Sequence, residues 1–138
     1  IVLCLVGSEM CIRDRNGGLD DAGATLEQLP SFAGVMIGRA AYRTPMILAD
    51  LAAPVFGREV PSRLQIAGVM ADYADRRTAE GVPLHAITRH MLGLYHGQRG
   101  ARLWRSHLGE EARNRRDGGA LIREVAAACE EMAARLAA

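Results

Sequence analysis

The sequence predicts an α/β segment followed by an all-α segment, and two observations lead to this fold class. The apolar run Gly34-Val35-Met36-Ile37-Gly38 lies between two helical patterns, which is the order of a βα unit. Beyond Gly57 the strand signals disappear, and apolar residues recur only at helical spacing. The chain has 138 residues, 49% of them hydrophobic, so it has the size of one domain and is not a fully disordered chain.

Composition and charge exclude several classes of protein. Seventeen basic residues, all arginine, are matched by sixteen acidic ones, so no global charge favours nucleic acid or membrane. The three cysteines, Cys4, Cys11 and Cys129, lack metal-ligand spacing, so neither a disulfide framework nor a metal site is predicted. The apolar run 1–6 is far shorter than the roughly 18–20 residues of a membrane span and lacks signal-peptide features, so a cytoplasmic location is expected.

The first part of the chain predicts one strand between two helices. Asn16-Gly17-Gly18 is a loop signal, and residues 20–29 predict a short helix. Residues 34–37 predict a buried strand. Thr44-Pro45 then predicts a helix start, with threonine as N-cap and proline at the first helical position, and the helix stops near Gly57. The inward residues predicted for these two helices are Ala22, Leu26, Leu29, Leu48, Leu51 and Val55.

Residues 1–15 differ in character from everything that follows. The string Leu-Val-Gly-Ser-Glu-Met-Cys-Ile-Arg-Asp resembles a translated sequencing-adapter read, so we expect a leader foreign to the gene and a chain that is a fragment. Three charges, Arg13-Asp14-Arg15, lead into Asn16, and burying them unpaired would cost several kcal/mol each. We therefore expect unrelated sequence in place of a strand before Asn16, which leaves the strand at Val35 without neighbours.

Residues 58–138 predict four helices that form a small bundle. Ser62 and Gln65 have capping-box spacing and open the first helix, and residues 84–96 form the second. The third and fourth follow the glycine-containing breaks at 97–100 and 118–119, with Glu111 and Arg115 as an outward ion pair. The predicted inward residues are Ile66, Val69, Met70, Tyr73, Leu84, Ile87, Met91, Leu94, Tyr95, Leu103, Trp104, Leu108, Ala112, Leu121, Val125, Cys129, Met132 and Leu136.

Two glycine turns are the first candidates for a functional site. They are Asn16-Gly17-Gly18 and Gly38-Arg39, the second of which directly follows the predicted strand. Glycine-rich turns expose backbone N–H groups to an anion, and Arg39 can bind phosphate bidentately. In a (β/α)₈ barrel the loops after the last two strands form such a phosphate site. From spacing alone, ordinary βα turns remain the alternative.

A basic helix face is the second candidate. At 100° per residue, His85, Arg89 and His96 fall within roughly 40° of one another on the helix predicted over 84–96. Arg99 and Arg102 follow directly, so this face could bind an RNA backbone. A solvated helix face is the alternative. His90 is expected to be a packed or capping residue, and Trp104 and Tyr95 are expected in the core rather than as stacking platforms.

These motifs resemble the tRNA-dihydrouridine synthase family. Asn16-Gly17-Gly18, with the run 34–42 and Pro45 after it, is similar to the end of that family's flavin-binding barrel. The runs 87–95 and 100–105 are similar to the helical domain of its A-type branch. The resemblance covers residues 16–138. It implies that 16–57 is the C-terminal remnant of an FMN-binding (β/α)₈ TIM barrel and 58–138 a helical tRNA-binding domain.

The resemblance also implies a function and its cofactors. It implies FMN- and NADPH-dependent reduction of a D-loop uridine in tRNA to dihydrouridine, by a full-length protein expected to be a monomer. The FMN phosphate would be held by Asn16, Gly17, Gly18, Gly38 and Arg39, and the tRNA by His85, Arg89, His96, Arg99 and Arg102. No cysteine here matches the family's catalytic acid, so no catalytic residue is predicted and the fragment is expected to be inactive alone. The alternatives are a helical RNA-binding module without catalytic activity and a different phosphate-binding barrel whose bundle contacts protein.

Overall fold

The computed structural model describes residues 14–16 by their backbone and residues 18–135 in full. Most of the leader expected over residues 1–15 therefore lies outside the described residues. Contacts divide the chain into two compact units, residues 1–59 and residues 60–138, which we describe separately as the first unit and the helical unit.

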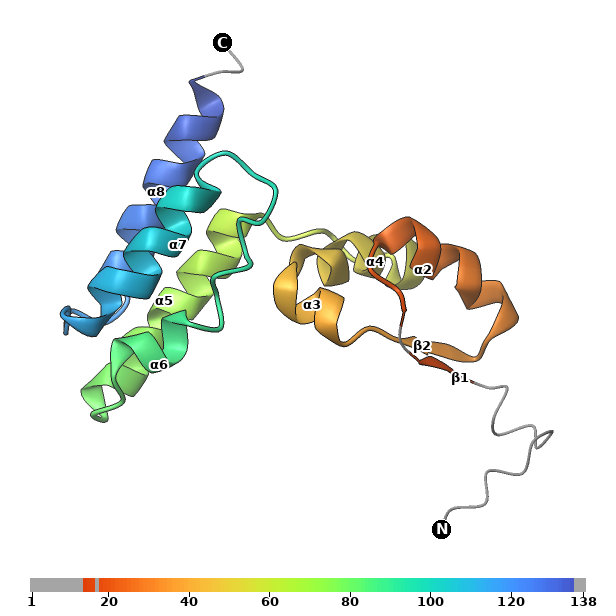
Figure 1. The fold of residues 1–138 in the computed structure, drawn as a ribbon, viewed down its shortest axis with the longest axis horizontal. Coiled ribbons are helices and arrows are strands. Elements are labelled where there is room, and N and C mark those ends of the chain that lie inside the picture. The colour runs from red at the N-terminus through yellow and green to blue at the C-terminus, as the bar shows by residue number, and fades with distance from the viewer. Residues whose placement is uncertain (1–13, 17, 136–138) are drawn as a thin grey trace. The chain divides into compact units, whose positions relative to one another are not determined.

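Two short parallel strands form the sheet of the first unit (Figure 1). Strand β1, Asp14–Asn16, pairs with β2, Gly34–Met36, in a register that places Asp14 opposite Gly34 and Asn16 opposite Met36. The prediction that no strand precedes Asn16, leaving β2 without neighbours, is wrong. The ladder is made by backbone N–H and C=O groups, which charged residues carry like any others, so the charge run does not prevent pairing.

A short capped helix connects the two strands. Helix α2, Ala22–Gln28, confirms the helix predicted over 20–29. Asp21 is its N-cap, and the Ala24 N–H donates to Asp21 Oδ1 at 2.8 Å. A 3₁₀ turn, η1 (Leu29–Ser31), follows α2 directly and leads into β2. The chain therefore runs strand, helix, strand, which is a βαβ unit.

Two helices follow β2, although one was predicted. Helix α3, Arg39–Arg43, was not predicted from the sequence. Helix α4, Met46–Phe56, confirms the second predicted helix and ends at Gly57, whose φ of +63° is favourable for glycine. Pro45 rather than Thr44 occupies the N-cap position of α4, without a side-chain cap.

The core of the first unit is small and uses only part of the stripe predicted on α4, since Leu51 is buried as predicted but the other two residues predicted there are not. Its buried residues are Ala40, Ile47 and Leu51, with the partly buried Ala22, Leu26, Ile37 and Ala41 packed against them. Leu48 and Val55, both predicted inward, are 52% and 38% exposed. Ile47 and Leu51 are one helical turn apart, so they lie on the same face of α4, which packs against α2 and α3. Leu48 lies beside this face.

The helical unit begins with α5, Arg63–Ala79. Its predicted capping box is confirmed, because Ser62 and Gln65 bond reciprocally through side chain and backbone. The buried face of α5 is not the predicted one, since Val69 is 68% exposed and Tyr73 is 40% exposed. The residues it buries instead are Ala67, Ala71 and Ala74. These small side chains let the partner elements approach the helix backbone closely.

Helix α6 is much shorter than predicted. It spans Leu84–Thr88, and the chain then continues to residue 100 in a series of turns. Bonds such as Leu94 N–H to the Met91 carbonyl, 3.0 Å, reach back three residues rather than four. Gly93 and Gly97 disfavour a continued helix, and Gly97 has a φ of +73°. The predicted inward residues of this segment are nevertheless confirmed as buried: Leu84, Ile87, Met91, Leu94 and Tyr95.

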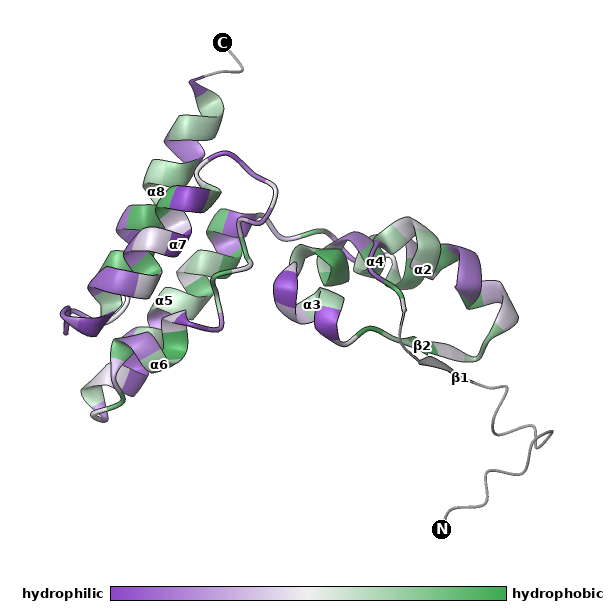
Figure 2. Ribbon diagram, in the orientation of Figure 1, coloured by the Kyte–Doolittle hydropathy of each residue, from purple (hydrophilic) through white to green (hydrophobic). Residues whose placement is uncertain are grey.

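Helices α7 (Ala101–Glu110) and α8 (Ala120–Ala134) complete the core, with the 3₁₀ turn η2 (Glu111–Arg113) following α7. In Figure 2 hydrophobic and hydrophilic stretches alternate along α5, α7 and α8, as amphipathic packing requires. Trp104 is fully buried, donates from Nε1 to the Met91 carbonyl at 2.8 Å, and lies 4.7 Å from the Tyr95 ring. Its predicted place in the core, and that of Tyr95, are confirmed.

Two predictions for the end of the chain are wrong. Glu111 pairs with His107, 2.6 Å from Nδ1 to Oε1, and not with Arg115. Arg115 instead bonds Asp117 and the Glu124 carboxylate, because the 113–118 loop turns its side chain toward α8. Met132, predicted to face inward, is 46% exposed because it lies in the last turns of α8, beyond the buried part of the helix. Leu136 lies outside the described residues.

Candidate functional site

The two predicted glycine turns start from the same edge of the sheet. Asn16 ends β1 directly opposite Met36, which ends β2. Because the strands are parallel, both turns leave from their carboxyl ends, on backbones that lie about 4.8 Å apart. The structure therefore brings the first turn and the Gly38-Arg39 turn together. Gly17 and the Asn16 side chain lie outside what the structure describes.

The glycines of these turns leave room for a group to approach the backbone. Gly18 has a φ of +72°, which favours glycine, and a Cβ added there would meet nothing within 4 Å. Gly38 is exposed and holds the N-cap position of α3. A Cβ at Gly38 would meet only the Met36 Sδ, at 3.7 Å, so its conformation does not require glycine. Its missing side chain leaves the start of α3 open.

The start of α3 supplies the donors that sequence reasoning missed. The N–H groups of a helix's first turn, here those of Arg39, Ala40 and Ala41, have no acceptor within the helix. Arg39 is exposed on the same turn and adds a forked cation. The sequence did contain a signal for helix α3, since Gly38 is followed by Arg-Ala-Ala, a run of good helix formers.

At the start of α2, by contrast, a backbone N–H group already has a side-chain acceptor. The Asp21 carboxylate accepts the Ala24 N–H, and the exposed Asp20 adds a second negative charge. An anion at this edge of the sheet is therefore better accommodated by α3 and Arg39 than by α2. The described residues fit a phosphate group at the α3 side of the edge.

The predicted RNA-binding residues are all exposed, but they do not share one helix face. His85 lies in α6, whereas Arg89 caps its end and His96 lies among the turns beyond. The angular argument that placed these three together assumed a helix over 84–96, which the structure does not form. Arg99 lies in the turn before α7, and Arg102 lies in its first turn.

Neighbouring histidine and cysteine side chains have structural partners. Arg89 donates from Nε to His90 Nε2 at 2.9 Å, and His90 is exposed, so of its two predicted roles, packed or capping, the packed one is wrong. Cys129 is fully buried, as predicted, and its Sγ lies 3.4 Å from the Gly100 carbonyl. Burial raises the pKa of the Cys129 thiol above its usual value, which disfavours the reactive thiolate.

Two kinds of feature are absent from the described part of the chain. Residues 14–16 and 18–135 contain no group of three or more His, Cys, Asp or Glu side chains that could hold a metal ion. Among the helices described, none is long and apolar enough to cross a membrane.

Comparison with known proteins identifies the class to which both units belong. The pattern of the dihydrouridine synthase family matches residues 15–133, which cover β1 and α8 except for one terminal residue of each, together with all the elements between them. The chain therefore belongs to the dihydrouridine synthase family.

Individual relatives agree with this assignment. A tRNA-dihydrouridine(20/20a) synthase of Xanthomonas campestris pv. campestris is 37% identical over 123 residues, 89% of this chain and 37% of the relative. A protein of the same name from Vibrio cholerae is 41% identical over 99 residues, 70% of this chain and 30% of the relative. One from Salmonella typhi is 42% identical over 99 residues, with the same coverage. The chain thus spans about a third of the length of these curated relatives.

Proposed function

We propose that this chain is part of an enzyme that reduces a D-loop uridine in tRNA to 5,6-dihydrouridine, with FMN as cofactor and NADPH as reductant. The observation that carries the proposal is the family match over residues 15–133, which includes both units in one alignment. The names of the relatives supply the substrate and the product, since all three are tRNA-dihydrouridine synthases.

In this proposal the first unit is the end of a (β/α)₈ TIM barrel. The parallel pairing of β1 and β2 across α2 is the repeating unit of such a barrel. Helix α3 matches the short extra helix whose N-terminus, with the loops after the last two strands, forms the usual barrel phosphate site. The described residues contain two strands, so a complete barrel needs more strands than these.

The cofactor phosphate would be held at the edge where the two turns meet. Asn16, Gly17, Gly18, Gly38 and Arg39 are the proposed residues, and the free amides at the start of α3 add donors. FMN, when bound, supplies hydride transfer. The role of this chain is to bind the phosphate and thereby fix the cofactor's position. We propose that the 138 residues alone do not catalyse the reaction.

The helical unit, which we propose to be a small four-helix bundle of α5, α6, α7 and α8, would bind the tRNA. Four exposed basic residues, Arg89, His96, Arg99 and Arg102, lie along the turns after α6 and the first turn of α7, with His85 in α6 itself. A surface made of turns and a helix end suits contacts to the shape and backbone of a folded RNA.

A chimera tests this function. In it, residues 15–133 of this chain replace the stretch that they match in the Xanthomonas campestris relative. We expect the purified chimera to carry bound flavin, seen by its visible absorbance, and to form dihydrouridine, measured by mass spectrometry of digested tRNA. Arg39→Ala should lower the flavin content, whereas Arg43→Ala, at the other end of α3, should not. A colourless chimera, or equal flavin in both variants, would contradict the proposal.

The alternative is a helical RNA-binding module without catalytic activity. The well-buried core of the helical unit favours this alternative, because the side chains of Trp104, Leu108 and Ile122 are at most 1% exposed. A chimera that binds folded tRNA but carries no flavin and forms no dihydrouridine would decide for the module.

A further inference from the structure

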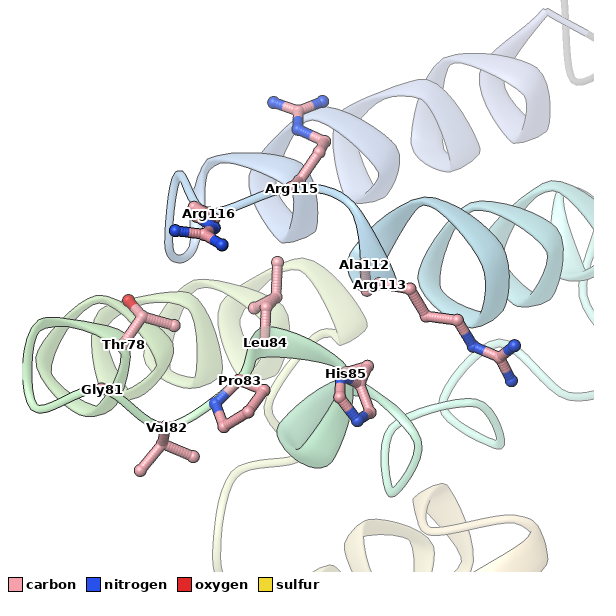
Figure 3. Close-up of a pocket in the computed structure, with 10 residues that line it drawn as sticks. All are labelled: Thr78, Gly81, Val82, Pro83, Leu84, His85, Ala112, Arg113, Arg115 and Arg116. Carbon is pink, nitrogen blue, oxygen red and sulfur yellow. The ribbon is translucent and has the colours of Figure 1, made fainter.

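A cavity in the helical unit is lined by His85 and by arginines not considered so far as RNA-binding residues. It has a volume of about 430 Å³ and lies between the turn that joins α5 to α6 and the segment 112–116 (Figure 3). Leu84 and Ala112, both nearly fully buried, line it together with Val82 and Pro83. Its volume is in the range of small-ligand pockets, roughly 300–1,000 Å³, and exceeds what a single ion needs.

Arginines border this cavity, and they have different partners. Arg115 is bonded to Asp117 at 3.0 Å and to Glu124 at 2.8 Å, and these bonds raise its guanidinium pKa. Figure 3 shows its side chain pointing away from Leu84 and His85. Arg113 and Arg116 are exposed, and no carboxylate among the described residues pairs with either. In Figure 3 the Arg116 side chain lies on the Thr78 side of Leu84, and the Arg113 side chain extends outward on the other side, beyond Ala112.

None of the described residues that line the cavity is acidic, and several carboxylates close to it in the chain have partners of their own. Glu80 is bonded by Arg77, and Glu111 is bonded by His107. Asp117 and Glu124 are both held by Arg115. The arginines that line the cavity without a carboxylate partner among the described residues are Arg113 and Arg116, and the exposed His85 lies beside them in the lining. The rim is basic although the whole chain has a net charge of only +1.

The segment that carries these arginines is held firmly in place. Arg115 fastens it to α8, and the Gly119 N–H donates to Asp75 Oδ1 of α5 at 2.6 Å. Gly118 and Gly119 are buried against α5, where a Cβ on Gly119 would lie 2.6 Å from the Ala71 carbonyl carbon. A rigid segment presents its two free guanidinium groups at low entropic cost, which favours binding.

We propose that this cavity is an RNA-strand site, in which Arg113 and Arg116 bind two phosphates and the apolar lining at Pro83 and Leu84 accepts a ribose or base. Two guanidinium groups on separate sides of Leu84 fit a ligand with repeated phosphates better than one small anion. This inference rests on the proposed function for the identity of the RNA, which would be tRNA.

Binding of labelled, folded tRNA to the 138-residue chain tests the site by fluorescence anisotropy. The variant R113Q/R116Q should bind tRNA at least about tenfold more weakly than the parent, because two phosphate contacts are lost. The slope of log K against log salt should also become shallower, by about 1.5. The matched control R58Q/R135Q removes the same charge from residues that do not line the cavity and should bind within about twofold of the parent. Circular dichroism establishes that each variant is folded.

Chemical modification gives a second measurement that does not depend on variants. Bound tRNA should protect Arg113 and Arg116 from phenylglyoxal, as read by mass spectrometry, and leave Arg135 reactive. Equal protection by inorganic phosphate alone would overturn the assignment to an RNA strand. If the parent binds tRNA and R113Q/R116Q binds equally well, the cavity assignment fails while the proposed function stands. If the folded parent binds no tRNA at low salt, both fail.

Discussion

The two units of this chain bury their apolar residues to very different degrees. In the helical unit Trp104 and Ile122 are fully buried, and Leu108 and Leu121 are each 1% exposed. In the first unit the buried cluster consists of Ala40, Ile47 and Leu51, while Leu48 and Phe56 are 52% and 72% exposed. The helical unit therefore has a closed core of large side chains, and the first unit does not.

The exposed apolar residues of the first unit line a groove. It measures about 390 Å³ and is formed by β2, α4 and the chain between α2 and β2. Val35, Ile37, Leu48 and Val55 contribute to it. A continuous apolar groove of this kind usually marks a surface that further protein covers. The helical unit thus closes its own core, whereas the first unit keeps an open apolar face, as the proposed barrel segment would.

Limited proteolysis should show the largest difference between the units. We expect a protease to remove the first roughly 57 residues and leave a resistant helical fragment, because proteolysis follows the population of locally open states. Mass spectrometry of a time course measures the fragments. A first unit that outlasts the helical unit would contradict the comparison.

The substitution Trp104→Ala should cost about 3–5 kcal/mol of unfolding free energy, because it removes a fully buried ring and its bond to the Met91 carbonyl. Phe56→Ala, at a 72% exposed site in the first unit, should change it by less than about 0.5 kcal/mol. Urea denaturation followed by circular dichroism measures both. Similar effects at the two sites would show that the cores do not differ as described.

Gly119→Ala should have the next largest effect, about 1–3 kcal/mol of destabilisation, because the new Cβ would collide with the Ala71 backbone. Gly109→Ala is the matched control, since a Cβ there meets nothing within 4 Å and alanine favours the α7 helix. The shift in Tm for each variant checks the prediction. If Gly119→Ala is as stable as Gly109→Ala, α5 and α8 do not pack this closely.

A pH dependence of stability should be the smallest effect. The bond from the Gly119 N–H, followed by the bond from Arg123, lowers the pKa of Asp75 below its usual 3.8. The ionised Asp75 therefore stabilises the folded state above about pH 4, and this contribution is lost as the pH falls through the lowered folded pKa. Urea midpoints between pH 2 and 7 should decline less steeply toward acid for Asp75→Asn. Identical slopes would exclude a role for Asp75.

Much of the helix order could be predicted from sequence, because it depends on local signals. Ser62 and Gln65 form the expected capping box, and Gly57 ends α4 as expected. The burial of Val69 and Tyr73 was predicted wrongly because hydrophobicity ranked them above Ala67 and Ala71. The close approach of α8 and the 118–119 glycines decides that face, and this is a contact between residues far apart in the chain.

The two turns of the candidate site could be predicted from the sequence, but the backbone N–H donors at the start of α3 could not. Glycine spacing located both turns, and the parallel register of β1 and β2 places them at one edge. Helix α3 was missed because five residues are too few for a periodic pattern. Arg113 and Arg116 were not singled out, since only the structure shows that they lack a carboxylate partner among the described residues, while Arg115 pairs with Asp117 and Glu124 instead of the predicted Glu111.

We propose that the first unit holds the cofactor and the helical unit holds the RNA. The most direct test compares flavin content and tRNA affinity in two variants of the chimera. Arg39→Glu should lose bound flavin and keep its tRNA affinity, while R113Q/R116Q should keep its flavin and lose at least about tenfold in affinity. An Arg39→Glu variant that retains full flavin would contradict the account.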